Sequence, residues 1–185
     1  MHLSKQTALI VVDVQKGFDD PKWGQRNNPE AEDNIAKLLA AWRQTQCPVF
    51  HIQHLSREPN SPLKSESPGC EIKDIVKPLV HEPVIQKHVN SAFIGTALEA
   101  RLRQEGCTTL VIVGFTTNHC VSTTARMAGN LGFETYVISD ATATFERTGP
   151  DGQHYKAEEI HAISLTNLHQ EFATVTDTAS LIGQL

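Results

Sequence analysis

Three reactive side chains occur where apolar segments of this sequence end. Asp13 interrupts the run TALIVVDV, Lys87 ends PVIQK, and Cys120 follows TTLVIVGF after a short turn. A nearby carboxylate can accept the proton of a thiol and later return one to a leaving group, while an ammonium group stabilises the thiolate. Together these residue types predict a nucleophilic cysteine site built from cysteine, lysine and aspartate.

Each of these residue types also has an ordinary structural role. Cysteines on helices are often packing residues, aspartates after strands often form turns, and lysines are usually solvated. The catalytic interpretation is favoured because Asp13 and Lys87 lie inside strands that should be buried, where ionised groups need partners. Cys120 should lie in the first turn of a helix, where the positive end of the macrodipole favours the thiolate.

The elements that must position these residues alternate along the chain. Apolar, β-branched runs predict strands over 7–14, 48–54, 83–89, 108–115, 133–139 and 172–176. Helical periodicity predicts helices over 31–46, 95–105, 119–131 and 154–170. The apolar positions expected to face the core are Ile35, Leu38, Leu39, Trp42, Leu98, Leu102, Ile160, Ile163 and Leu168. This alternation predicts a parallel sheet with helices on both faces, and ligands bind beyond the carboxyl ends of such strands.

Length and composition are those of one globular domain. The chain has 185 residues and a formal net charge of −5 without a long basic run, so nucleic acid is not an expected partner. No apolar stretch is long enough to span a membrane, and no signal peptide is evident, so we expect a cytoplasmic protein whose four cysteines are free thiols. The proline-rich stretch 55–82 has little periodicity and should be an insertion, which either forms a lid or an oligomer contact or is simply solvated.

Several segments also match a known family. The stretch GFTTNHCVSTTARMAGNLGFETYVISDATATF (114–145) resembles the signature block of isochorismatase-like cysteine hydrolases. ALIVVDVQKGF (8–18) is similar to the D-x-Q-x-x-F strand end of that family, and VIQKHVNSAFIGT (84–96) to its lysine segment. FATVTDT (172–178) resembles its closing strand, so the resemblance covers nearly the whole chain in the family's order.

The resemblance implies both a site and a fold. It implies a catalytic triad of Asp13, Lys87 and Cys120, a cis peptide between Phe115 and Thr116, and an oxyanion hole formed by the backbone amides of Thr116 and Cys120. It further implies a single three-layer αβα domain over 1–185, with six parallel strands in the order 3-2-1-4-5-6, that assembles as a homodimer or homotetramer. The implied reaction cleaves the carbon–nitrogen bond of a small linear or cyclic amide through a thioester.

Metal binding is the property in which this sequence departs from part of the family. Nicotinamidase-like members hold a metal ion with an aspartate and histidines after the second strand. The corresponding segment here, HIQHLSREP, has His51 and His54 but no Asp-x-His. Side chains three apart on a strand point to opposite faces, so we interpret both histidines as structural or loop-facing residues. We therefore predict neither a metal nor another cofactor.

Two other functions remain open, and the substrate pocket is predicted only in outline. Members that cleave the vinyl ether of isochorismate need no cysteine, so one alternative uses Asp13 as the acid of such a reaction. The other alternative is a non-catalytic protein that binds a metabolite. The residues expected to line the pocket for a small-molecule substrate are Phe18, Trp23, Phe93, Asn118, His119 and Phe145. We do not expect a Cys–His dyad with His119, because neighbours at a helix start rarely point at each other.

Overall fold

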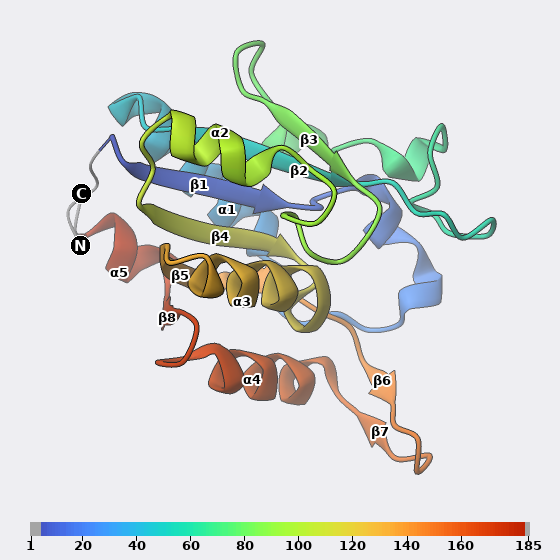
Figure 1. The fold of residues 1–185 in the computed structure, drawn as a ribbon. Helices are drawn as coiled ribbons and strands as arrows, with labels where there is room; N and C mark the ends of the chain where they lie inside the picture. Colours follow the sequence, from blue (N-terminus) through green and yellow to red (C-terminus); the bar gives the residue numbers. More distant parts are fainter. Residues whose placement is uncertain (1–4, 184–185) are drawn as a thin grey trace.

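The computed structural model describes residues 5–183, and a six-stranded parallel sheet lies at its centre (Figure 1). The strands are ordered β3-β2-β1-β4-β5-β8, with the last strand in the sequence at the far edge, which confirms the predicted fold and strand order. Their bounds are β1 Thr7–Val12, β2 Val49–His54, β3 Val84–Lys87, β4 Thr109–Phe115, β5 Glu134–Ala143 and β8 Thr174–Thr176.

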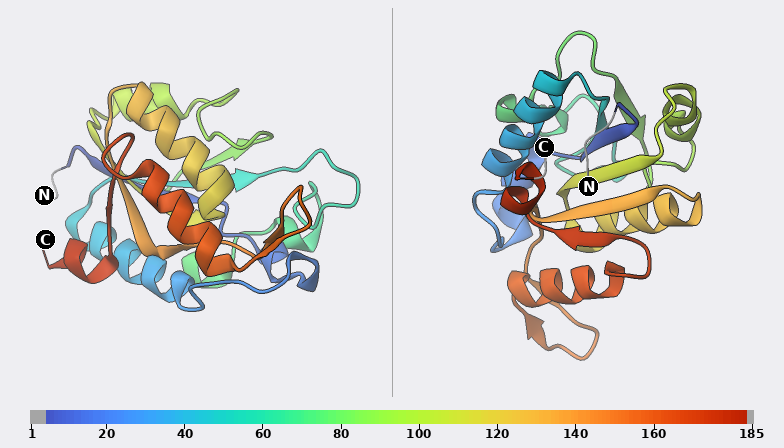
Figure 2. Two further views of the ribbon diagram at one scale, coloured as in Figure 1. Left: turned by 90° about the horizontal axis from the view of Figure 1, so that it is seen from below. Right: turned by 90° about the vertical axis from the view of Figure 1, so that its left-hand side faces the viewer.

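Helices cover both faces of the sheet, as the views from below and from the left-hand side show (Figure 2). Helices α1 (Ala31–Thr45) and α5 (Thr178–Ile182) lie on one face. Helices α2 (Leu98–Gln104), α3 (Ser122–Asn130) and α4 (Ala157–Leu168) lie on the other. A small antiparallel hairpin, β6 (Arg147–Thr148) and β7 (His154–Tyr155), projects beyond the sheet.

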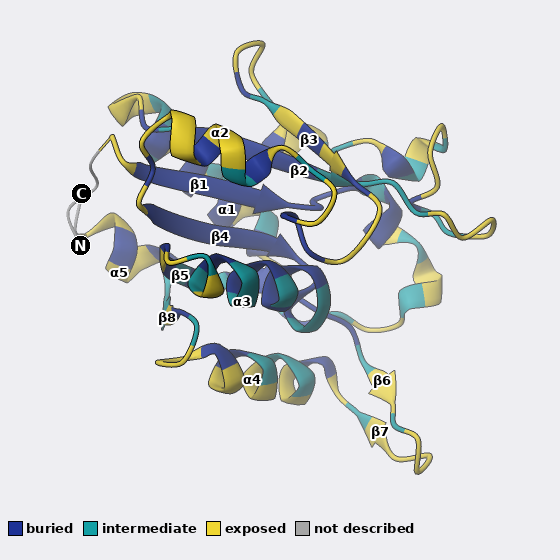
Figure 3. Ribbon diagram, in the orientation of Figure 1, coloured by how far each residue is buried: buried dark blue, intermediate teal, exposed yellow. Residues whose placement is uncertain are grey.

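Alternating side chains of the central strands build two separate cores. In β1, Ala8, Ile10 and Val12 pack under one helical layer, while Leu9 and Val11 pack under the other. All six residues of this strand are buried (Figure 3), and burial on both faces explains why every residue after Thr7 is apolar. Strands of this kind leave no room for a charged group unless another charge compensates it.

Three features differ from the sequence prediction. Ile163 on α4 is 57% exposed, because the buried stripe of that helix runs through Ala157, Leu165 and Leu168 instead. Helix α5 and the β6–β7 hairpin were not predicted, since their few residues carry no periodicity.

Within residues 5–183, no helix has the length and apolar character needed to cross a membrane.

Candidate active site

The three residues singled out in the sequence come together at one edge of the sheet. Asp13 directly follows β1, Lys87 is the last residue of β3, and Cys120 lies in a π-helical turn, Thr117–Val121, between β4 and α3. The carboxyl ends of parallel strands share one edge of a sheet, so segments far apart in the sequence meet there. This is the edge toward which the strand arrows point in Figure 1.

The Lys87 ammonium is the centre of this site. Its Nζ lies 2.6 Å from Asp13 Oδ2 and 3.2 Å from Cys120 Sγ. It also donates to the backbone carbonyl of Val89 at 3.2 Å and contacts His54 Nδ1 at 3.0 Å. Asp13 and Lys87 are buried and Cys120 is 9% exposed, so a fully desolvated ion pair lies beside a thiol that only just reaches the surface.

Burial has the largest effect on the pKa values of Cys120 and Asp13. Burial and the Asp13 carboxylate raise the pKa of the Cys120 thiol, and the Lys87 ammonium opposes them without overcoming them. Burial likewise raises the pKa of Asp13, again against the effect of Lys87. The macrodipole and the ammonium, which favour the thiolate, therefore do not outweigh near-complete burial beside a carboxylate, and the pKa of Cys120 lies above the ordinary thiol value.

The backbone before the cysteine has an unusual course. The peptide bond between Phe115 and Thr116 is cis, and both Thr116 and Cys120 line the adjacent cavity. Gly114 just before them has a φ of 114°, and a Cβ there would lie 2.0 Å from the carbonyl oxygen of Val12. Only glycine allows β4 to approach β1 this closely before the chain turns toward the nucleophile.

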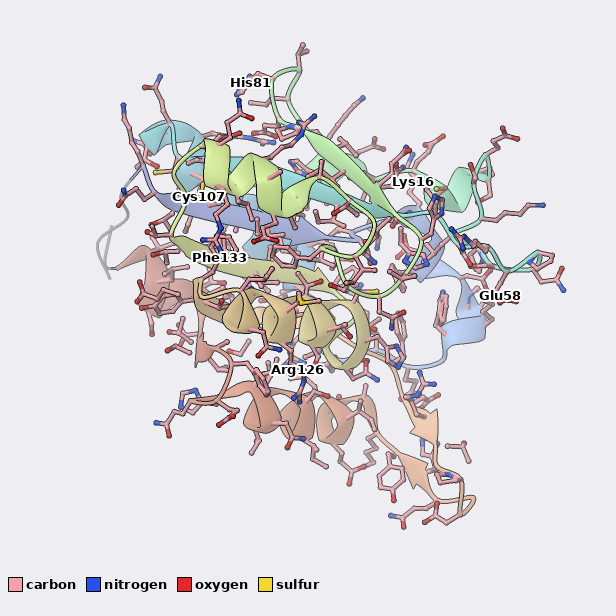
Figure 4. All side chains as sticks on the ribbon, viewed as in Figure 1. Lys16, Glu58, His81, Cys107, Arg126 and Phe133 are labelled. Atoms are coloured by element: carbon pink, nitrogen blue, oxygen red, sulfur yellow. The ribbon has the colours of Figure 1, made fainter. Side chains whose placement is uncertain are left out.

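A cavity of about 430 Å³ lies beside this site, and Asp13 and Cys120 line it, whereas Lys87 does not. One wall is apolar: the Phe18 and Trp23 rings lie 5.5 Å apart and Phe145 stacks within 6.1 Å of both. The rim carries charges of both signs, from Lys22, Glu58, Glu146 and Arg147. Glu58 lies at the end of the molecule where the site is, whereas Cys107 lies near the other end (Figure 4).

The candidates for the pocket wall separate into two groups. Phe18, Trp23, Phe145 and His119 line the cavity, and His119 Nδ1 lies 3.3 Å from Thr116 Oγ1. Phe93 and Asn118 lie outside its lining. The Phe93 ring packs in the core, 6.2 Å from the Phe133 ring, and Asn118 Oδ1 accepts a hydrogen bond of 2.6 Å from the Thr144 hydroxyl.

Sequence reasoning missed His54 as a site residue. His54 was predicted to be structural or loop-facing, and the structure instead places it in the cavity lining and in contact with Lys87. His51 does have a structural role. It is buried on the opposite face of β2, and its Nε2 lies 2.9 Å from Glu82 Oε2. The available signal was position: His54 ends a strand that lies between the strands leading to Asp13 and Lys87.

The same side chains include a potential metal-ligand set. Asp13, His54 and Cys120 each have an atom that could bind a metal ion, and these atoms lie within 4.8 Å of one another. Among residues 5–183, this is the one group of three or more histidine, cysteine or acidic side chains that is close enough to share a metal ion. However, all three residues also contact Lys87 Nζ, at distances of 2.6 to 3.2 Å. The ammonium fills the position where a metal ion would have to bind, and a metal-free site stays our prediction.

The fold and the site together define a hydrolase of the three-layer αβα class. The family model described as "Isochorismatase domain" matches residues 7–180, and the chain belongs to the isochorismatase family.

Close relatives extend over the whole chain. The isochorismatase family protein YrdC of Bacillus subtilis is 54% identical over 181 residues, which is 98% of this chain and 97% of YrdC. A crystal structure of a hydrolase of the isochorismatase family from Chromobacterium violaceum has a TM-score of 0.95 at 44% identity and covers 100% of this chain and 96% of its own. The crystal structure of a cysteine hydrolase from Pseudomonas syringae has a TM-score of 0.90 at 28% identity, and the match covers 100% of this chain and 94% of that protein's chain.

Proposed function

We propose that the protein is a cysteine hydrolase that cleaves a carbon–nitrogen bond of a small amide-type substrate. The observation that carries this proposal is the contact of one buried ammonium with both a carboxylate and a thiol, 2.6 Å from Asp13 Oδ2 and 3.2 Å from Cys120 Sγ, at the floor of a cavity. A thiol nucleophile, a proton acceptor and a counter-cation are the groups that acyl transfer through a thioester requires.

Asp13 would begin the reaction as a general base. Its Oδ1 is buried and has no N–H or O–H partner among residues 5–183, so it is free to take the thiol proton. The Cys120 thiolate then attacks the amide carbon, and its charge passes to the former carbonyl oxygen. The backbone N–H groups of Thr116 and Cys120 would bind that oxygen, and one such donor typically contributes about 3 kcal/mol.

The same carboxyl group would complete the cycle. Protonated Asp13 gives its proton to the departing nitrogen, so ammonia or an amine leaves and a Cys120 thioester remains. Water then attacks the thioester while Asp13 accepts one of its protons. The thiolate takes up the proton held by Asp13 when the acid product leaves, which restores the starting state.

Two relatives support a carbon–nitrogen bond as the target. Nicotinamidase 3 of Arabidopsis thaliana is 29% identical over 191 residues, and the ureidoacrylate amidohydrolase RutB of Methylobacterium radiotolerans is 28% identical over 214 residues. Both names specify hydrolysis of an amide-type bond in a small molecule. A cavity of about 430 Å³ with an aromatic wall suits a substrate of that size.

The test is ammonia or amine release from a panel of small linear and cyclic amides. Cys120→Ala should reduce release by about a thousandfold or more, whereas Cys107→Ala, which removes a buried thiol at the other end of the sheet, should not. Unchanged release in Cys120→Ala would refute the nucleophile assignment.

A vinyl-ether hydrolase is the second candidate, because the raised pKa of Asp13 favours the protonated acid that such a reaction needs. This candidate predicts cleavage of isochorismate that survives Cys120→Ala and is lost in Asp13→Asn. The opposite result, with isochorismate left intact by the wild-type protein, would remove it.

A further inference from the structure

The register of two strands places His54 against the catalytic lysine. In the parallel pairing of β2 and β3, His54 lies directly opposite Lys87. Paired residues of adjacent strands project from the same side of the sheet about 5 Å apart. Their side chains therefore run together toward the site, where His54 Nδ1 lies 3.0 Å from Lys87 Nζ.

A buried glutamine fixes the backbone of this histidine. Gln15 Oε1 accepts a hydrogen bond of 2.8 Å from the His54 backbone N–H, and Gln15 Nε2 donates to the His54 carbonyl at 3.0 Å. The same amide donates to the carbonyl of Cys70 at 2.8 Å. Gln15 is fully buried, so its amide serves as a structural clamp that holds His54 at the end of β2.

The contact with lysine determines where the imidazole carries its proton. An ammonium group can only donate, so His54 Nδ1 must be the acceptor and the neutral ring carries its proton on Nε2. Burial, followed by the charges of Lys87 and His88, lowers the pKa of His54 to about 4, which keeps the ring neutral near pH 7. Within residues 5–183 no side chain or carbonyl accepts a hydrogen bond from Nε2, and the ring lines the cavity.

We propose that His54 positions the Lys87 ammonium through Nδ1 and offers its Nε2–H to an acceptor oxygen on the substrate. The second half of this inference rests on the proposed amide hydrolysis. It narrows the substrate to a small amide that carries another oxygen acceptor, such as a second carbonyl or a carboxylate, close to the scissile group.

The positioning role follows from a count of hydrogens. Lys87 Nζ has three hydrogens and four neighbours: Asp13 Oδ2, Cys120 Sγ, His54 Nδ1 and the Val89 carbonyl. His54 and Val89 hold two of them in place. The third hydrogen bonds Asp13 while that group is a carboxylate, and it turns to Sγ when the thiol proton has moved to Asp13.

Two substitutions separate the roles of the two ring nitrogens. In His54→Asn, the amide oxygen can take the place of Nδ1 and accept from Lys87, but the distant N–H is lost. In His54→Gln, the amide nitrogen can take the place of Nε2, but the acceptor at Nδ1 is lost. His88→Gln is the matched control, because His88 is exposed and lies outside the cavity lining.

The first readouts need no substrate. Nitrogen-15 NMR of labelled imidazoles should show His54 as a neutral ring protonated on Nε2 from pH 5 to 8. Alkylation of Cys120 by iodoacetamide should slow by about tenfold in His54→Gln, the equivalent of one charge-assisted hydrogen bond, and stay within about twofold of wild type in His54→Asn and His88→Gln. A ring that titrates near pH 6.5, or carries its proton on Nδ1, would overturn the positioning role, as would equal alkylation in all three variants.

The readout for substrate binding is the separation of KM from kcat. With a dicarbonyl amide or an amide that bears a carboxylate, His54→Asn should raise KM by about tenfold and leave kcat nearly unchanged. The same variant should not affect a simple amide without the second oxygen. An equal loss on both substrates would refute the donor role. If NMR and alkylation behave as expected but no amide is cleaved by the wild-type protein, amide hydrolysis fails while the positioning of Lys87 stands.

Discussion

Lys87 connects four polar groups beside the cavity. Its ammonium contacts a carboxylate, a thiol, an imidazole and a backbone carbonyl within 3.2 Å, and its side chain is buried along its whole length. Removing one of these partners should destabilise the protein more than removing a partner of an exposed charge, because water cannot take its place in the buried site. The geometry of this one side chain therefore holds the other three groups together.

A direct consequence concerns the reactivity of Cys120. Because burial and Asp13 raise the pKa of the thiol, we expect alkylation of Cys120 to be slow at pH 7 and to keep rising above pH ~8.5, the ordinary thiol value. Mass spectrometry of each cysteine after timed labelling measures this. Cys107, whose pKa burial raises to about 11, is the internal comparison. Fast labelling of Cys120 that levels off below pH 7 would contradict the prediction.

Some residues of this site can be predicted from the sequence, and the others cannot, for physical reasons. Asp13 and Lys87 are recognisable because charges inside apolar strands need partners, and Cys120 because its surroundings match a family signature. His54 was missed because its contact with Lys87 depends on the register of two strands that are 33 residues apart, which local patterns do not encode. Phe93, which packs in the core, was placed in the pocket for another reason: the sequence does not distinguish an aromatic residue that faces the core from one that faces a cavity.

At the level of elements, a second polar network holds the other end of the sheet. Glu82, in the loop before β3, accepts hydrogen bonds of 2.7 and 2.8 Å from the Arg43 guanidinium on α1. His51 of β2 lies 2.9 Å from the same carboxylate, and the backbone N–H of Leu79 donates to it at 2.9 Å. The network connects α1 and the loop to the end of the sheet that lies opposite the site.

This network predicts a loss of stability in acid. Its hydrogen bonds lower the pKa of Glu82 from 4.5 to about 2, against the effect of burial. The folded carboxylate binds a proton more weakly than the unfolded one, so its stabilisation is present above pH 4.5 and is lost as the pH falls toward 2. We expect a loss of about 2 kcal/mol in the free energy of unfolding, allowing for solvent screening.

Urea unfolding of wild type and Glu82→Gln at pH 6 and pH 3 measures this contribution. The difference between the two proteins should shrink at the lower pH, while Glu171→Gln, at an exposed position, should match wild type at both. A difference that is the same at both pH values would show that Glu82 does not carry the acid sensitivity.

Elements were predictable where burial imposes a repeating pattern. The six strands and the helices near α1 to α4 follow from apolar runs and helical periodicity. The orientation of α4 could not be predicted in this way, because Ile163 faces outward and Leu165 faces the core although both are apolar. Strands of two residues, such as β6 and β7, depend on pairing with each other rather than on any pattern of their own.

For the whole molecule, the important arrangement is the convergence of three loops over one end of the sheet. Residues from three segments, 18–23, 56–63 and 144–147, contribute to the cavity lining. Lys22 Nζ donates to the Asn60 carbonyl at 3.1 Å and so joins the first segment to the second. The first part of the proline-rich segment thus lies over the site, in keeping with a lid. Assembly as a homodimer or homotetramer stays a prediction, and analytical ultracentrifugation measures it.

Packing at Gly17 should control how these loops close. A Cβ at this position would lie 2.8 Å from the Leu63 side chain and 2.9 Å from the carbonyl oxygens of Pro62 and Gly69. We expect Gly17→Ala to displace 62–69 and raise the KM of an amide substrate by about tenfold, with a loss of about 1–2 kcal/mol in stability. In Gly106→Ala, where φ is +68° but nothing lies within 4 Å, about 1 kcal/mol should be lost without a change in KM. Similar KM changes in both variants would contradict a specific role for loop packing.

The position of Lys87 between two proton carriers also has an electrical consequence. Transfer of a proton from Cys120 to Asp13 exchanges one anion for another, and both lie within 3.2 Å of the same ammonium. The sum of charges inside the buried site is zero before and after the transfer. In the proposed mechanism, the thiolate would therefore form without exposing an uncompensated charge to the low-dielectric interior and without drawing an ion from the solvent. A nucleophile formed in this way should depend little on ionic strength, since no mobile ion takes part in forming it.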